Sequence, residues 1–169
     1  MSTPTAIQPP VNEDMIMGHL REIMDPEIPV LSIVDLGIVR QIMLQPTNDT
    51  IPDIEVIITS TYTGCPAMDM IATQIRVMLA SLGFKHVKVT QSISPAWTTD
   101  WITEHGKQQL AAYGIAPPDK RFNIPADGVR CPRCGSTQTR LLSEFGSTAC
   151  KSLYQCSDCQ EPFDYFKCH

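Results

Sequence analysis

Two pairs of cysteines near the end of the chain restrict its fold more than any other feature. Cys131 and Cys134 form one C-x-x-C pair, Cys156 and Cys159 form the other, and 21 residues (135–155) separate them. A two-residue gap lets both thiolates of a turn bind one ion, and two such turns supply the four sulfurs of a closed tetrahedral zinc site. The pattern predicts a zinc ribbon in which these four cysteines hold a structural zinc ion.

The residue types alone leave two alternatives to zinc. Four thiolates also bind iron or a cluster, and the cysteines could instead be unliganded or paired in disulfides. Six of the seven cysteines lie between Cys131 and Cys168, and in a reducing compartment such crowding favours metal over disulfides. Size favours metal as well. Residues 128–169 number 42, which is close to the length below which a core alone seldom sustains a fold.

Three further side chains of the tail, Cys150, Cys168 and His169, are able to bind a metal. Each is either a spare ligand or a residue without a metal role. For Cys150 we favour packing as a small apolar side chain, because free cysteine is often simply buried. The tail's aromatic residues pose a similar choice, between a protein-docking surface and a core, and for a domain of this size we favour the core. They are Tyr154, Phe163, Tyr165 and Phe166.

The chain before the tail has the pattern helix, strand, strand, helix, strand. Asn12 is a suitable N-cap for the first helix, which should stop before Pro26 because the residue preceding proline is pushed out of the α region. An apolar stripe from Met68 to Leu82 marks the second helix, and Gly83 is placed to end it. The remaining expected elements are strands at 38–44, 54–59 and 87–90 and a helix-rich stretch over 100–113 that ends at Gly114.

These patterns predict an α+β chain in four parts. Residues 1–11 form a flexible lead, and residues 12–114 form a small two-layer α/β domain, a three-stranded sheet with helices on one face. Residues 115–127 are a linker rich in turn-forming residues, and residues 128–169 are the zinc ribbon.

Cys65 stands apart from the other cysteines, between the second strand and the second helix. Pro66 suits the first helical position, which would make Cys65 the N-cap. There the helix dipole would stabilise a thiolate and lower the pKa of the thiol, so that Cys65 could act as a nucleophile or a soft-metal ligand. Thr61 and Thr63 would line the same loop, and Asp35 could reach it from the loop before the first strand. The alternative is that Cys65 merely caps a helix.

Charge and hydropathy exclude two classes of partner. The chain has 13 Lys and Arg against 18 Asp and Glu, a net charge of -5. Nucleic-acid affinity comes largely from Lys and Arg that neutralise phosphates, so no nucleic-acid partner is expected. No apolar stretch approaches the roughly 20 residues of a membrane span, so no membrane partner is expected. The N-terminus has neither a basic start nor an apolar segment, which predicts a cytoplasmic location.

Several motifs carry a family resemblance. Asp-Pro-Glu at 25–27, Ser-Ile-Val-Asp-Leu-Gly at 32–37 and Thr-x-x-Gly-Cys-Pro at 61–66 resemble the MIP-type iron–sulfur assembly family. With the four-cysteine tail, Phe-Gly-Ser-Thr-Ala-Cys-Lys at 145–151 and Glu-Pro-Phe-Asp-Tyr-Phe-Lys-Cys at 161–168, the chain is similar to the PaaD family. Its members are the D subunits of phenylacetyl-CoA epoxidase systems, which act in aerobic phenylacetate degradation.

This resemblance implies a role in the maturation of other subunits. The epoxidase system has two metal centres that need assembly, an iron–sulfur cluster in the reductase subunit and a di-iron site in the oxygenase subunit. The chain itself lacks the paired Glu-x-x-His motifs of a di-iron oxygenase and any dinucleotide fingerprint. The resemblance maps the family's functional cysteine to Cys65 and its loop acid to Asp35. It implies a transient iron or iron–sulfur cluster at Cys65, in addition to the structural zinc.

We therefore expect an accessory, non-enzymatic factor that helps to assemble a cluster or iron in the reductase or oxygenase subunits. Its partners would be the epoxidase subunits, the iron–sulfur reductase above all, and a homodimer is left open. The alternative from a different class is a non-catalytic interaction subunit with a purely structural ribbon. A thiol enzyme that uses Cys65 is a third reading, since a low-pKa thiol is the feature that such enzymes need.

Overall fold

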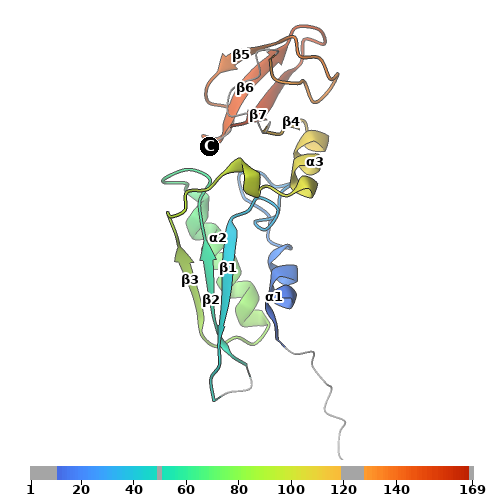
Figure 1. Ribbon diagram of the computed structural model, residues 1–169. Helices are drawn as coiled ribbons and strands as arrows, with labels where there is room; N and C mark the ends of the chain where they lie inside the picture. Colours follow the sequence, from blue (N-terminus) through green and yellow to red (C-terminus); the bar gives the residue numbers. More distant parts are fainter. Residues whose placement is uncertain (1–10, 49–50, 119–127, 168–169) are drawn as a thin grey trace, which may run out of the picture.

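The computed structural model describes residues 11–48, 51–118 and 128–167. The expected flexible lead (except residue 11), most of the expected linker, and Cys168 with His169 lie outside these residues. The chain forms a three-stranded sheet followed by a four-stranded sheet, and Figure 1 shows the second above the first with helix α3 beside their boundary.

The first sheet has the order β1-β2-β3 and contains the three expected strands. β1 (Val39–Gln45) runs antiparallel to β2 (Asp53–Ile58), and β2 runs parallel to β3 (Val87–Gln91). A parallel pair needs a crossover, and α2 (Ala67–Ser81) supplies it. α1 (Glu13–Leu20) and α2 contact each other and also contact the sheet. Both helices therefore cover one face, as expected.

The helix ends follow the local capping chemistry. Asn12 accepts a hydrogen bond from the Met15 amide at 2.8 Å and caps α1, but the helix ends at Leu20, well before Pro26. Gly83 has a φ of +97°, a left-handed conformation that terminates α2 as expected. Among the described residues, no helix is long and apolar enough to cross a membrane.

The helix-rich stretch expected over 100–113 is two elements. A 3-10 helix, η1 (Thr99–Trp101), is followed by α3 (Glu104–Tyr113), which ends at Gly114 with a φ of +94°. The break has a local cause, because Thr103 is extended and its hydroxyl accepts from the Gly106 amide as the N-cap of α3. α3 lies beyond the end of the three-stranded sheet, not on its helical face (Figure 1).

The second sheet has the order β4-β7-β6-β5. Its tail strands are β5 (Thr139–Ser143), β6 (Lys151–Cys156) and β7 (Pro162–Phe166). β4 (Ile115–Ala116) follows α3 directly and pairs parallel to β7. Ile115 and Ala116 lie in the expected linker 115–127, yet they belong to the tail's sheet, because the edge of β7 offers their backbone groups hydrogen-bond partners that no local pattern reveals.

The two halves also share a core. Phe166 of β7 is fully buried, and its ring lies 5.9 Å from that of Trp97, which belongs to the segment after β3. The Trp97 indole donates to the Leu36 carbonyl at 3.0 Å. The tail aromatics Tyr154, Phe163 and Tyr165 are buried in the second sheet, so the expectation that these aromatics form a core is confirmed.

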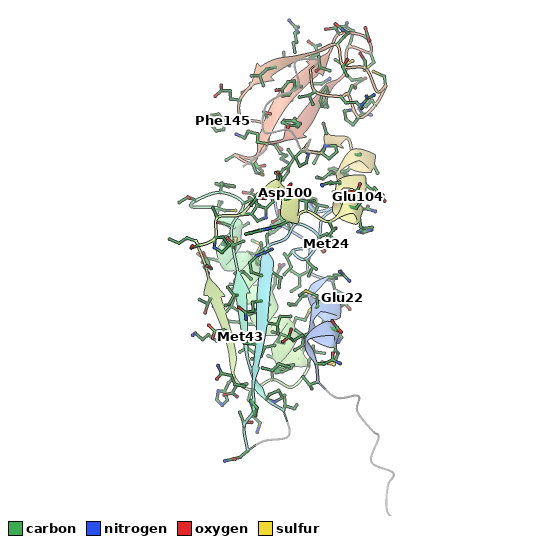
Figure 2. The ribbon with its side chains drawn as sticks, viewed as in Figure 1. Glu22, Met24, Met43, Asp100, Glu104 and Phe145 are labelled. Carbon is green, nitrogen blue, oxygen red and sulfur yellow. The ribbon has the colours of Figure 1, made fainter. Side chains whose placement is uncertain are left out.

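Large apolar side chains remain exposed in both halves. Met24 in the loop after α1 is 48% exposed, and Phe145 in the loop after β5 is 65% exposed. Both side chains are labelled in Figure 2. Leu141 and Leu142 of β5 are also exposed. Among the described residues of the ribbon, the exposed large apolar side chains are therefore Leu141, Leu142 and Phe145, whereas the four aromatics considered for a docking surface are buried.

Candidate functional site

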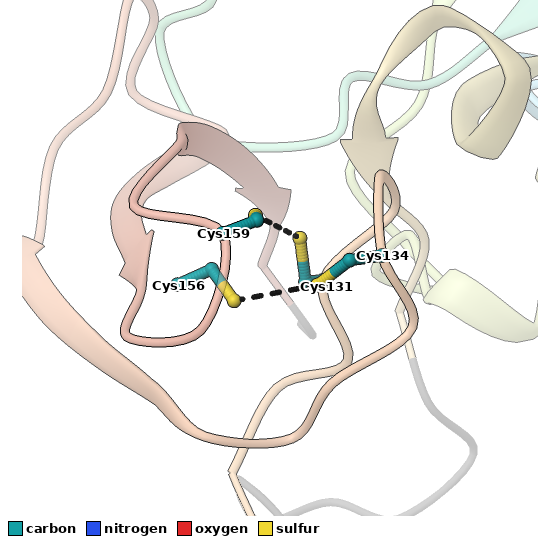
Figure 3. A group of neighbouring side chains, drawn as sticks. All are labelled: Cys131, Cys134, Cys156 and Cys159. Atoms are coloured by element: carbon teal, nitrogen blue, oxygen red, sulfur yellow. Dashed lines mark hydrogen bonds between the residues drawn. The ribbon is translucent and has the colours of Figure 1, made fainter.

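The four paired cysteines converge on one point, drawn in Figure 3. Their Sγ atoms all lie within 4.8 Å of one another, with 3.8 Å between Cys131 and Cys159 and 3.5 Å between Cys134 and Cys156. Zn–S bonds of about 2.3 Å at tetrahedral angles place sulfurs about 3.8 Å apart. The four cysteines therefore form a metal-binding group whose spacing fits a tetrahedral ion.

The two turns that carry these cysteines reach the same shape by different means. Gly135, after the first pair, has a φ of +77°, and Gln160, at the equivalent place after the second pair, has a φ of +65°. Glycine adopts this region freely, whereas any other residue is strained there. The Gln160 side-chain amide donates to the Ser157 carbonyl, which helps to hold the second turn.

The thiols of the cluster differ in how readily they ionise. The backbone N–H of Cys159, with further help from that of Asp158, lowers the pKa of Cys156 to about 7. The Ser136 N–H favours a thiolate at Cys134, but the neighbouring thiols Cys156, Cys159 and Cys131 raise the pKa of Cys134 to about 12. One thiolate thus forms readily and disfavours the next, and a bound cation removes that repulsion.

Cys65 lies between β2 and α2, and the helix begins one residue later than expected. Pro66 occupies the N-cap position and α2 begins at Ala67. The Cys65 carbonyl accepts from the Met68 amide at 3.3 Å, so the residue joins the first turn through its backbone, and Cys65 is not the N-cap. The side chain is half-buried.

The electrostatics of Cys65 also differ from the expectation. Burial raises the pKa of the thiol, and the carboxylates of Glu27 and Asp25 raise it further. The Ala67 amide and the Tyr62 hydroxyl act in the opposite direction but do not outweigh burial. The expected net lowering of the Cys65 pKa is therefore wrong, although the Ala67 amide at the start of α2 does act in that direction. A neutral thiol at this place does not suit a thiol enzyme, whose nucleophile is a thiolate.

Asp35 is engaged elsewhere in the fold. Its carboxylate accepts from Thr103 Oγ1 at 2.7 Å and from Ser32 Oγ at 2.8 Å, and lies 3.3 Å from His105 Nδ1. Burial alone would raise the pKa of Asp35, but these hydrogen bonds lower it below its ordinary value. The structure thus ties Asp35 to the start of α3. Thr61 is buried and Thr63 is exposed, both in the loop of Cys65.

Sequence reasoning missed the acidic residues that do act on Cys65. Asp25 is 5% exposed, and its Oδ1 accepts from the amides of Glu27 and Ile28 at 2.8 Å each. The Tyr62 hydroxyl donates to Glu27 Oε1 at 3.2 Å and also hydrogen-bonds the Cys65 thiol. The Asp-Pro-Glu motif was the available signal. Asp25 and Glu27, on either side of Pro26, could have been predicted as site residues from this motif.

Two protein-family models match the chain. Residues 13–90 match the "Iron-sulfur cluster assembly protein" model, and residues 116–167 match the "PaaD zinc beta ribbon domain" model. The first contains Cys65 and its acidic neighbours, and the second contains all four paired cysteines. The chain therefore belongs to the class of proteins in which an iron–sulfur assembly domain is joined to a zinc ribbon.

Relatives define the family more closely. The chain is 47% identical over 167 residues to an Escherichia coli protein provisionally named as the D subunit of 1,2-phenylacetyl-CoA epoxidase, covering 97% of this chain and 96% of that protein. The chain belongs to the PaaD family, which contains these D subunits. It is also 35% identical to an Fe-S protein maturation auxiliary factor of Porphyromonas gingivalis, over 58% of this chain and 90% of that one.

A solved structure supports the fold of the first half. A Bacillus anthracis domain of unknown function, DUF59, aligns with a TM-score of 0.52 at 23% identity, and the alignment covers 58% of this chain and 90% of that chain. This likeness bears on the fold alone.

Proposed function

We propose that this protein is an accessory maturation factor for a phenylacetyl-CoA epoxidase complex and helps to assemble an iron–sulfur cluster, or iron, in its reductase or oxygenase subunits. The α/β half holds the iron or cluster transiently at Cys65, the ribbon is held by a structural zinc ion, and the ribbon docks the client. The protein performs no catalysis of its own.

One observation carries this proposal: the cysteine of an iron–sulfur assembly domain lies beside Glu27 and Asp25 in a chain that otherwise belongs to an epoxidase-subunit family. A half-buried thiol with a carboxylate nearby is able to bind iron reversibly, because the cation supplies the positive charge that the ionised group needs. The exposed side chains of Leu141, Leu142 and Phe145 offer the ribbon an apolar surface for a client.

A second function, a non-catalytic interaction subunit, is favoured by the raised pKa of Cys65. A neutral thiol is an adequate packing residue, and in this case the ribbon is a structural clip. The two functions differ in one respect, which is whether the Cys65 sulfur is needed for the client to acquire its metal.

The deciding experiment expresses the epoxidase components with the wild-type chain, with Cys65→Ser, or with Ser81→Ala at the exposed end of α2 as a control. We expect Cys65→Ser to lower the iron and sulfide content of the reductase several-fold and epoxidase activity with it, while Ser81→Ala leaves both unchanged. Normal cluster content with Cys65→Ser would remove Cys65 from the mechanism. Anaerobic preparations with one zinc and no iron after reconstitution would then favour the interaction subunit.

A further inference from the structure

Strand β6 links the metal-binding group of the ribbon to the core of the α/β half. Cys156, one of the four clustered cysteines, is its last residue, and Lys151 is its first. Cys150, directly before the strand, is 1% exposed and belongs to the core of the α/β half, as does Phe166 of the neighbouring strand β7. One strand therefore has a cysteine of the metal-binding group at one end and a residue of the other half's core beside its other end.

The residues at the start of β6 contact the loop that carries the Asp-Pro-Glu motif. Lys151, whose side chain is 5% exposed, places its Nζ 3.5 Å from the Glu27 carbonyl oxygen. The Cys150 thiol donates to Glu27 Oε2 at 3.8 Å, and Oε1 accepts from the Tyr62 hydroxyl at 3.2 Å. Tyr62 belongs to the loop between β2 and α2, which also contains Cys65. Polar contacts therefore connect the ribbon to Glu27, and Glu27 to the loop of Cys65.

The Asp-Pro-Glu loop fixes its own backbone turn but not the side chain of Glu27. Asp25 Oδ1 accepts from the amides of Glu27 and Ile28 at 2.8 Å each. The Asp25 amide donates to the Leu31 carbonyl, also at 2.8 Å. Glu27 itself lines a cleft of about 610 Å³ between the halves. Its carboxylate therefore has room to move once the contacts from the ribbon are lost.

We propose that the metal ion of the ribbon controls the position of Glu27 and, through Glu27, the loop of Cys65. The ribbon is the element with two states, because a domain of its size gains its order from the bound metal. With the ion bound, β6 is ordered and its first residues hold Glu27 beside Tyr62. Without the ion, Cys150 and Lys151 leave the α/β half, and the hydrogen bond from Tyr62 to Glu27 loses this support. The switch does not require iron at Cys65, so it goes beyond the proposed function.

The test is amide hydrogen exchange of the full chain, read by mass spectrometry of peptides, with zinc bound and after a chelator has removed it. We expect zinc removal to speed exchange at residues 25–32 at least about tenfold, because several contacts to this loop are lost together. Strands β1 and β2 should keep their slow exchange. With zinc bound, Lys151→Met should speed exchange at 25–32 about threefold to tenfold, as the loss of one hydrogen bond allows. Lys167→Met is the matched control and should change nothing there, because the Lys167 ammonium contacts the Glu144 carbonyl and the Phe145 ring within the ribbon.

Slow exchange at residues 25–32 in a zinc-free chain whose second sheet exchanges freely would overturn the proposal, and so would a second sheet that stays protected without zinc. If zinc removal also exposes β1 and β2, the zinc-loaded Lys151→Met variant decides: faster exchange at 25–32 supports the switch and unchanged exchange overturns it. The outcome is separable from that for the proposed function. A fully loaded reductase with Cys65→Ser removes Cys65 from maturation and leaves the switch in place, whereas unchanged exchange at 25–32 removes the switch and leaves Cys65 in maturation.

Discussion

The four ribbon cysteines and Cys65 lie in opposite kinds of surroundings. The ribbon group takes all four sulfurs from two short turns of one sheet, and these sulfurs already lie within 4.8 Å of one another. Around Cys65 the ligand atoms are not gathered in this way, because among the described residues only the ribbon cysteines form a group of three or more metal-ligating side chains. The ribbon group is pre-arranged for one ion, which suits a permanent structural metal. Cys65 instead has a thiol whose pKa is raised by burial and by the nearby carboxylates of Glu27 and Asp25.

The largest expected effect comes from breaking the ribbon group. Cys131→Ser removes one of four ligands from a tail of small size, so we expect the zinc content to fall from one ion per chain to nearly none. The second sheet should then lose its order, because metal binding and folding are coupled in such domains. Metal analysis and NMR spectra of the full chain measure both. Cys65→Ser is the matched control and should keep its zinc, and a zinc-loaded Cys131→Ser would contradict the four-sulfur site.

Removal of the ring that joins the halves should have the next largest effect. Phe166 is fully buried against Trp97, and Phe166→Ala should cost about 3–5 kcal/mol of unfolding free energy. Urea denaturation measures the change. Phe145→Ala, at a ring that is 65% exposed, should change stability by about 0.5 kcal/mol or less. Equal costs for the two variants would mean that the shared core does not stabilise the protein.

The chemical difference between Cys65 and the ribbon cysteines predicts slow alkylation of Cys65. Because burial raises the pKa of its thiol, the thiolate fraction at pH 8 is below that of a free cysteine, and the reaction with iodoacetamide should be several-fold slower. The rate should still be rising at pH 9. Tyr62→Phe should slow it further, because the Tyr62 hydrogen bond lowers the pKa of Cys65. Peptide mapping by mass spectrometry follows the rate. Fast labelling near pH 6 would instead support a thiol enzyme.

The smallest expected effect lies within the ribbon itself. Gln160 holds a left-handed conformation that glycine adopts more easily, so Gln160→Gly should stabilise the zinc-bound ribbon by up to about 1 kcal/mol. The reciprocal Gly135→Gln should destabilise it by about 1–2 kcal/mol. Thermal unfolding of the zinc-loaded chain compares the two. A loss of stability in Gln160→Gly would indicate that the hydrogen bond from its side chain to Ser157 outweighs the backbone strain.

Local patterns were sufficient for much of this protein. The C-x-x-C spacing identified the four sulfurs that converge. Residue types at helix ends identified Asn12 as the N-cap of one helix and Gly83 and Gly114 as the ends of two others. Alternating and helical apolar patterns found the three strands of the first sheet and the helices α1 and α2. These features depend on neighbours within a few residues, so the sequence by itself determined them. The functional roles of Cys65, Asp35, Thr61 and Thr63 remain predictions.

Only the tertiary structure decided how distant segments meet. It paired Ile115 and Ala116 with β7, bound Asp35 to Thr103 and His105, and placed Glu27 between Tyr62 and Cys150. It also reversed the expected direction of the Cys65 pKa, because burial and two carboxylates outweigh a nearby helix terminus. Such contacts depend on packing between segments up to 123 residues apart in sequence, and no local spacing or capping rule contains that information.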